Sequence, residues 1–75
     1  MTTELLRFMD RVGATDAEVS EATGLSISGI WRLKHGHRRP SAATAFILHA
    51  WAAERAVKAR LRVAERLSWE GLVGD

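Results

Sequence analysis

The chain has 75 residues, of which 47% are hydrophobic and 27% are charged, with a formal net charge of +2 and no cysteine. This composition is typical of one small globular helical domain, and it excludes a disulfide-supported scaffold, a disordered tail and cysteine-based catalysis or zinc binding. We expect a cytoplasmic protein, because the chain shows no signal-peptide pattern and no apolar run of membrane-spanning length.

The first predicted element is a short amphipathic helix that is closed by Gly13. It carries the apolar residues Leu5, Leu6, Phe8, Met9 and Val12. Thr15-Asp16-Ala17-Glu18 then has the form of a capping box, in which the Thr15 hydroxyl and the Glu18 carboxylate both bond free backbone amides. The sequence therefore predicts a second helix that begins at Asp16.

A glycine turn separates this helix from a third one, predicted over residues 27–35. Gly24 accepts the positive φ that lets one helix stop, and Ser26 is suited to cap the next. Ile30 and Leu33 form one apolar stripe, while the opposite side of the helix carries Ser28, Trp31, Arg32 and His35. Gly36 ends the helix, and Pro40 prevents a new one before Ser41.

Residues 42–68 are predicted to form one long helix, because neither proline nor glycine occurs between Ser41 and Gly71. Apolar residues recur along it at spacings of three and four: Phe46, Ala50, Ala53, Val57, Leu61, Ala64 and Leu67. At about 1.5 Å per residue such a helix extends past a domain of this size. We expect its second half to form a homodimer interface through Val57, Leu61, Ala64 and Leu67. The alternative is a bend that folds the chain back onto its own bundle.

Positive charge is concentrated in one part of the chain. No acidic residue occurs between Glu21 and Glu54, and this interval holds Arg32, Lys34, Arg38 and Arg39. Such a local field attracts polyanions, although basic faces are often merely solvated. The position of the cluster at the end of the third helix favours nucleic acid as the partner.

Between about Leu5 and Leu48 the sequence resembles the Cro and phage-repressor family of helix-turn-helix DNA-binding domains. The motif residues are Val19, Gly24, Leu25, Ser26, Ile30 and Leu33, and the loop residues are Gly36, Arg38, Arg39, Pro40 and Ser41. The resemblance implies an all-α fold with a small helical bundle of about four N-terminal helices. The long C-terminal helix that extends the bundle is unlike the short helices closing a typical family domain. The length of the chain predicts a single domain over residues 1–75.

The resemblance also implies a dimeric regulator of transcription, typically a repressor, that reads a palindromic site in double-stranded DNA through the helix 27–35. The residues expected to contact bases are Ile27, Ser28, Trp31 and Arg32. Those expected to contact phosphates are Thr15, Lys34, His35, His37, Arg38 and Arg39.

Several positions depart from the family's pattern. Asp16 stands where the family often has glutamine, and a carboxylate there repels phosphate. Lys34 stands where glutamate is common, so we do not expect the usual internal ion pair. Ser20 replaces a packed alanine, and its hydroxyl needs a backbone partner. Gly29 costs the helix about 1 kcal/mol relative to alanine.

Two other functions remain open. The first is a protein-interaction module, such as an antitoxin-like protein or an anti-repressor partner, which would use Trp31 or the long helix. The second is an architectural protein that coats DNA without regard to sequence. Trp31 itself either reads thymine, binds a protein or is buried, whereas Trp51 and Trp69 are expected to pack, and His49 to be packed or solvated. We expect no enzyme, metal, cofactor or small-molecule ligand, because no nucleophile stands beside a base and no carboxylates converge.

Overall fold

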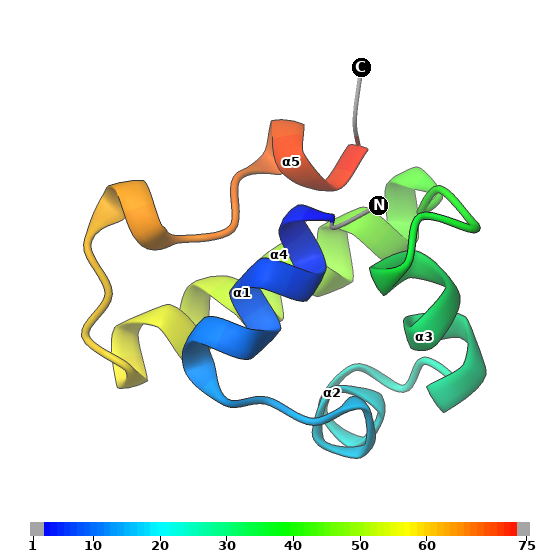
Figure 1. Ribbon diagram of the computed structural model, residues 1–75, viewed down its shortest axis with the longest axis horizontal. Helices are drawn as coiled ribbons and strands as arrows, with labels where there is room; N and C mark the ends of the chain where they lie inside the picture. Colours follow the sequence, from blue (N-terminus) through cyan, green and yellow to red (C-terminus); the bar gives the residue numbers. More distant parts are fainter. Residues whose placement is uncertain (1–2, 74–75) are drawn as a thin grey trace.

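Within residues 3–73, which a computed structural model describes, five α-helices and one 3₁₀ turn make up an all-α bundle (Figure 1). The elements are α1 (Glu4–Val12), α2 (Asp16–Thr23), α3 (Ile27–Lys34), α4 (Ala42–Lys58), η1 (Val63–Glu65) and α5 (Trp69–Val73). α1 crosses α4 in the middle of the view, α2 and α3 lie together at one end, and η1 lies at the other. The predicted all-α class is confirmed. No helix of the described residues is long and apolar enough to cross a bilayer.

α2, α3 and α4 begin where the sequence predicts, and α1 ends before Gly13 as expected. Thr15, Ser26 and Ser41 each accept a bond from the backbone N–H three residues later, which satisfies one of the free amides at a helix start. α2 ends at Gly24, whose φ of 79° places it in the left-handed region, as predicted from the glycine turn. The two helices of the motif are thus separated by a turn of three residues.

The core is formed by apolar side chains from every helix of the bundle. Its most deeply buried large members are Phe8, Met9, Val19, Ile30 and Leu48. Leu33 is 8% exposed, so the inward stripe predicted for α3 is confirmed. Trp51 is half-buried and packs edge-on against Phe8 with ring centroids 5.8 Å apart, which agrees with its expected packing role.

The prediction of one helix over residues 42–68 is wrong, because α4 ends at Lys58. The backbone N–H of Leu61 donates to the carbonyl of Ala56, and that of Arg60 donates to the carbonyl of Val57. These two bonds define a Schellman motif, which terminates a helix with one residue in the left-handed region. Arg60 takes that position with φ 57°, although the residue usually found there is glycine.

After this turn the chain folds back onto the bundle, as in the alternative considered for the long helix. Leu67 and Leu72 are 5% and 7% exposed and belong to the core. The guanidinium of Arg11 donates to the carbonyl of Glu65 at 2.6 Å, and a Cβ added to Gly71 would lie 2.8 Å from Cγ of Glu4. Residues 62–73 therefore cover α1.

This turn places the four residues of the predicted dimer interface in different parts of the fold. Leu67 is in the core, Leu61 is partly buried against it, and Ala64 is exposed on η1. Only Val57 stays on α4, with 62% of its surface exposed. These four residues do not share one helix face, so the interface expected from the sequence is corrected.

Candidate nucleic-acid interface

The outer side of α3 is open to solvent. Ile27 is 52% exposed and Trp31 48% exposed, and Ser28 and Arg32 are exposed as well. The helix is held from below by Ile30 and Leu33 and from its start by Ser26, whose hydroxyl accepts from the Gly29 amide at 3.0 Å. The structure thus brings all four residues expected to contact bases onto one accessible face.

Trp31 is neither buried nor isolated. Its ring lies 4.5 Å from that of His35, tilted by 47°, and 5.5 Å from that of His37, nearly parallel at 10°. The backbone N–H of His37 donates to the carbonyl of Arg32 at 2.9 Å, which folds the chain back after the helix. The side chain of Trp31 is therefore oriented by two imidazoles. Burial, one of the three roles considered for it, does not occur within the described residues.

Lys34 and Asp16 form an ion pair that was not predicted from the sequence, in place of the family's usual pair, which needs glutamate at position 34. Lys34 Nζ lies 2.6 Å from Asp16 Oδ1, and the side chains are only 16% and 23% exposed. The two departures from the family's pattern therefore compensate each other by linking α2 to α3. Lys34 is turned away from the open face of α3, and the ammonium of Lys34 balances the charge of the Asp16 carboxylate.

The capping box predicted at the start of α2 is only half formed. The Thr15 hydroxyl accepts from the Glu18 amide at 3.1 Å, as the capping box requires. The Glu18 carboxylate, however, lies 3.2 Å from Arg55 Nε on α4 instead of closing the box. Ser20 has the backbone partner that its hydroxyl needs, since it donates to the carbonyl of Leu25 at 2.5 Å.

The loop between α3 and α4 presents the basic residues of the cluster. His37, Arg38 and Arg39 are exposed, and Gly36 turns the chain with φ 74°. Neither arginine takes part in an ion pair with another residue of the described part of the chain. Together with Arg32 they form a positive rim at the C-terminal end of the exposed face.

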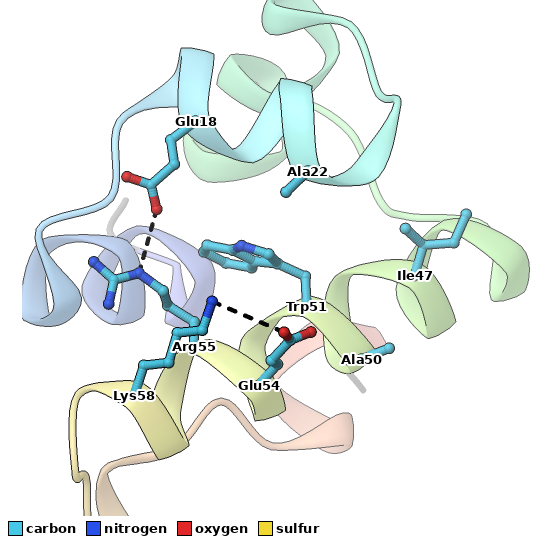
Figure 2. Close-up of a pocket in the computed structure, with 8 residues that line it drawn as sticks. All are labelled: Glu18, Ala22, Ile47, Ala50, Trp51, Glu54, Arg55 and Lys58. Atoms are coloured by element: carbon cyan, nitrogen blue, oxygen red, sulfur yellow. Dashed lines mark hydrogen bonds and ion pairs between the residues drawn. The ribbon is translucent and has the colours of Figure 1, made fainter.

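A groove of about 590 Å³ runs between α2 and α4 (Figure 2). Trp51 lies between the two helices in this view, and the other lining residues are Glu18, Ala22, Ile47, Ala50, Glu54, Arg55 and Lys58. The charges are paired, Glu18 with Arg55 at 3.2 Å and Glu54 with Lys58 at 3.9 Å. Such a lining suits contact with another surface more than it suits chemistry on a substrate.

Arg55 is a residue that the sequence did not single out. Besides pairing with Glu18, its guanidinium donates to the carbonyl of Val12 at 2.9 Å, so it joins α4 to both α1 and α2. Its spacing from Lys58 is that of an ordinary helix surface, and no local signal marks it. His49, by contrast, packs edge-on against Trp69 with centroids 5.8 Å apart, in line with the packing expected for both.

Comparisons of this chain with family models, with curated proteins and with solved structures find no match. The resemblance to Cro and phage-repressor domains therefore depends on the motif residues themselves. Their placement is consistent with it in three respects: the turn at Gly24, the inward direction of Ile30 and Leu33, and the exposed loop of Arg38 and Arg39.

Proposed function

We propose that this protein is a transcriptional regulator of the repressor type that binds a specific sequence of double-stranded DNA through α3. The observation that carries the proposal is the division of α3 into two sides. Ile30 and Leu33 are buried, whereas Ser28 and Arg32 are exposed beside a basic loop. A helix fixed in this way presents its outer side chains to the major groove, which is about 12 Å wide and admits one helix.

The outer side chains of α3 differ in what they offer to base edges. The guanidinium of Arg32 is suited to bond O6 and N7 of guanine at the same time, and the Ser28 hydroxyl is suited to either base type. Ile27 and Trp31 offer apolar surface to thymine methyl groups. The tilted contact of Trp31 with His35 and its stacking on His37 restrict its rotamers before any contact with a partner is made. Its aromatic surface is therefore presented at a smaller cost in entropy.

Phosphate contacts are assigned to the rim of this face. Arg38, Arg39 and His37 extend from the loop, and His35 follows α3. Thr15, at the start of α2, adds backbone amides of the kind that bind phosphate at helix N-termini. We leave Lys34 out of this set because its ammonium is held by Asp16.

The test is selection of bound duplexes from a random pool at two salt concentrations, followed by affinity measurements on two variants. Arg32→Ala is expected to lose discrimination at one base pair, worth about 1–3 kcal/mol. Arg39→Ala is expected to weaken binding to all sequences alike. Equal losses for both variants on selected and on random duplexes would defeat the assignment. Equal affinity of the unmodified protein for every duplex would instead support sequence-indifferent coating of DNA.

Binding to another protein is the second candidate, and the exposed apolar residues of α3 and α4 favour it. Trp31 is 48% exposed and Phe46 69% exposed. If Trp31 serves a protein partner, Trp31→Ser abolishes the capture of that partner and leaves DNA affinity unchanged. A loss of DNA affinity in the same variant, with no partner recovered from cell extract, supports the reading role.

A further inference from the structure

α4 carries an apolar stripe that nothing in the described part of the chain covers. It consists of Phe46, Ala50, Ala53 and Val57, all of them exposed, with Phe46 at 69% and Val57 at 62%. Their spacings of four, three and four keep them within one narrow band of a continuous helix, because residues at these intervals lie above one another. We define these four residues as the α4 stripe. It is the part of the predicted seam that remains on one helix.

The order of residues in the α4 stripe is symmetric about the middle of the helix. In an antiparallel pair of identical helices, residues whose numbers have a constant sum lie at the same level. Phe46 and Val57 add to 103, and so do Ala50 and Ala53. A two-fold axis between Trp51 and Ala52 would therefore set Phe46 against the second copy's Val57, and Ala50 against the second copy's Ala53.

We propose that the α4 stripe is an isologous interface with a second copy of this chain, formed by antiparallel packing of α4 on α4. A closed two-fold contact requires a surface that is complementary to itself, and this sequence order supplies one. The two alanines at the centre let the helix axes approach closely, while Phe46 and Val57 close the ends.

The charges beside the stripe are compatible with this packing. Glu54 and Lys58 lie on one flank of α4, 3.9 Å apart, together with Ile47. In the same register, Ile47 of one copy falls between the second copy's Glu54 and Lys58, whose carbon stems would cover it. In this register Glu54 and Lys58 lie level with no lysine, arginine or carboxylate of the second copy's α4, because these levels belong to His49 and Ala45, which pack within their own chain.

The groove of Figure 2 continues the α4 stripe toward α2. Ile47 and Ala50 line it, and Ala22 adds apolar surface from the facing helix. A standard interface buries roughly 800 Å² on each partner. This is about one sixth of the 4954 Å² that the chain exposes, so the groove wall as well as the stripe must take part.

The inference does not depend on DNA binding, and it is tested without DNA. The purified full chain is studied by sedimentation equilibrium from about 5 to 500 μM, a span around the micromolar affinities of weak interfaces. A monomer–dimer equilibrium is expected. Ala50→Glu places two carboxylates beside the axis and is expected to raise the dissociation constant at least tenfold. Ala64→Glu is the matched control, because it adds the same charge to an exposed alanine on η1 and is expected to change nothing.

A charge-reversal pair tests the register and the identity of the partner. Ala53→Lys alone is expected to weaken the dimer as Ala50→Glu does, whereas a mixture of the two variants brings the new glutamate opposite the new lysine. The mixture is expected to associate at least tenfold more tightly than either variant alone. Three results would each overturn the proposal. The chain could stay monomeric throughout the concentration range, in which case the α4 stripe would bind a different protein. The dimer could be lost in Ala64→Glu but kept in Ala50→Glu, or the mixture could associate no more tightly than its components.

Discussion

The outer face of α3 and the α4 stripe are both exposed, yet they offer different chemistry to a partner. The α3 face combines a hydroxyl, a guanidinium and a tryptophan in contact with two imidazoles, and a loop with two exposed arginines follows it. The α4 stripe presents only carbon, with its neighbouring charges already paired. The first composition suits a polyanion, and the second suits an apolar surface. Any contacts made through these two surfaces are therefore expected to be separable by salt and by substitution.

The largest effect is expected from removing part of the core beneath α3. Ile30 is fully buried beneath α3. Ile30→Ala is expected to lower the free energy of unfolding by about 2–5 kcal/mol, a large share of the roughly 4–11 kcal/mol usual for a domain of this length. Urea unfolding followed by tryptophan fluorescence measures it. Ile27→Ala, at a position 52% exposed, is the control and is expected to change stability by less than about 0.5 kcal/mol. Similar losses in both would contradict the inward direction of Ile30.

Salt is expected to affect the two surfaces differently. The logarithm of DNA affinity is expected to fall linearly with the logarithm of salt concentration, and Arg39→Ala to reduce the slope by about 1, with a loss of roughly 1 kcal/mol at low salt. The dimer constant of the α4 stripe is expected to change little over the same range, because apolar burial carries no counterion release. Fluorescence anisotropy with a labelled duplex measures the first and sedimentation the second.

Arg66→Ala is the control for this experiment. Arg66 follows η1, which lies at the opposite end of the bundle from α3 (Figure 1). Its removal is expected to leave the slope unchanged. If Arg66→Ala and Arg39→Ala flatten the salt dependence equally, the basic loop has no special part in binding DNA.

The ion pair between Asp16 and Lys34 sets the position of α3 relative to α2. A double-mutant cycle with Asp16→Asn and Lys34→Met is expected to give a coupling energy of about 1 kcal/mol, because both side chains are largely shielded from solvent. The same cycle on Glu54 and Lys58, which are 75% and 68% exposed, is expected to give about 0.3 kcal/mol. Equal couplings would show that the pair between α2 and α3 is no stronger than a surface contact.

The smallest expected effect concerns the end of α4. Arg60 has φ 57°, a conformation that costs side chains with a Cβ but not glycine. Arg60→Gly is expected to raise stability by about 0.5–1 kcal/mol after allowance for the greater entropy of glycine in the unfolded chain. Thermal unfolding monitored by circular dichroism measures the gain. Arg62→Gly, two residues on in extended backbone, is the control and is expected to destabilise.

The first four helices could be predicted because their signals are local. Thr15, Ser26 and Ser41 mark helix starts, Gly24 marks an end, and the spacing of Ile30 and Leu33 shows which side is buried. The exposure of Ser28 and Arg32 follows from the same periodicity. For this reason the residues expected to contact bases are placed together as the sequence predicts.

What could not be predicted depends on contacts between distant parts of the chain. α4 ends in a Schellman motif whose left-handed residue is Arg60, and no glycine marks the position. The pairing of Lys34 with Asp16, and of Glu18 with Arg55, requires the relative placement of separate helices. The stacking of Trp31 on His37 depends on the reversal of the chain after α3. Periodicity in a single segment contains none of this information.

The return of residues 62–73 over α1 also bears on the order in which the molecule is made. Leu67 and Leu72 complete the apolar packing near α1, which is synthesised before the other described helices. The segment that covers α1 is therefore synthesised about sixty residues later, and until then α1 lacks part of its native surroundings. A truncated mRNA that ends after the codon for Lys58 would yield a chain in which the part of α1 covered by residues 62–73 is exposed. We expect cellular proteases to degrade such a chain faster than the full one.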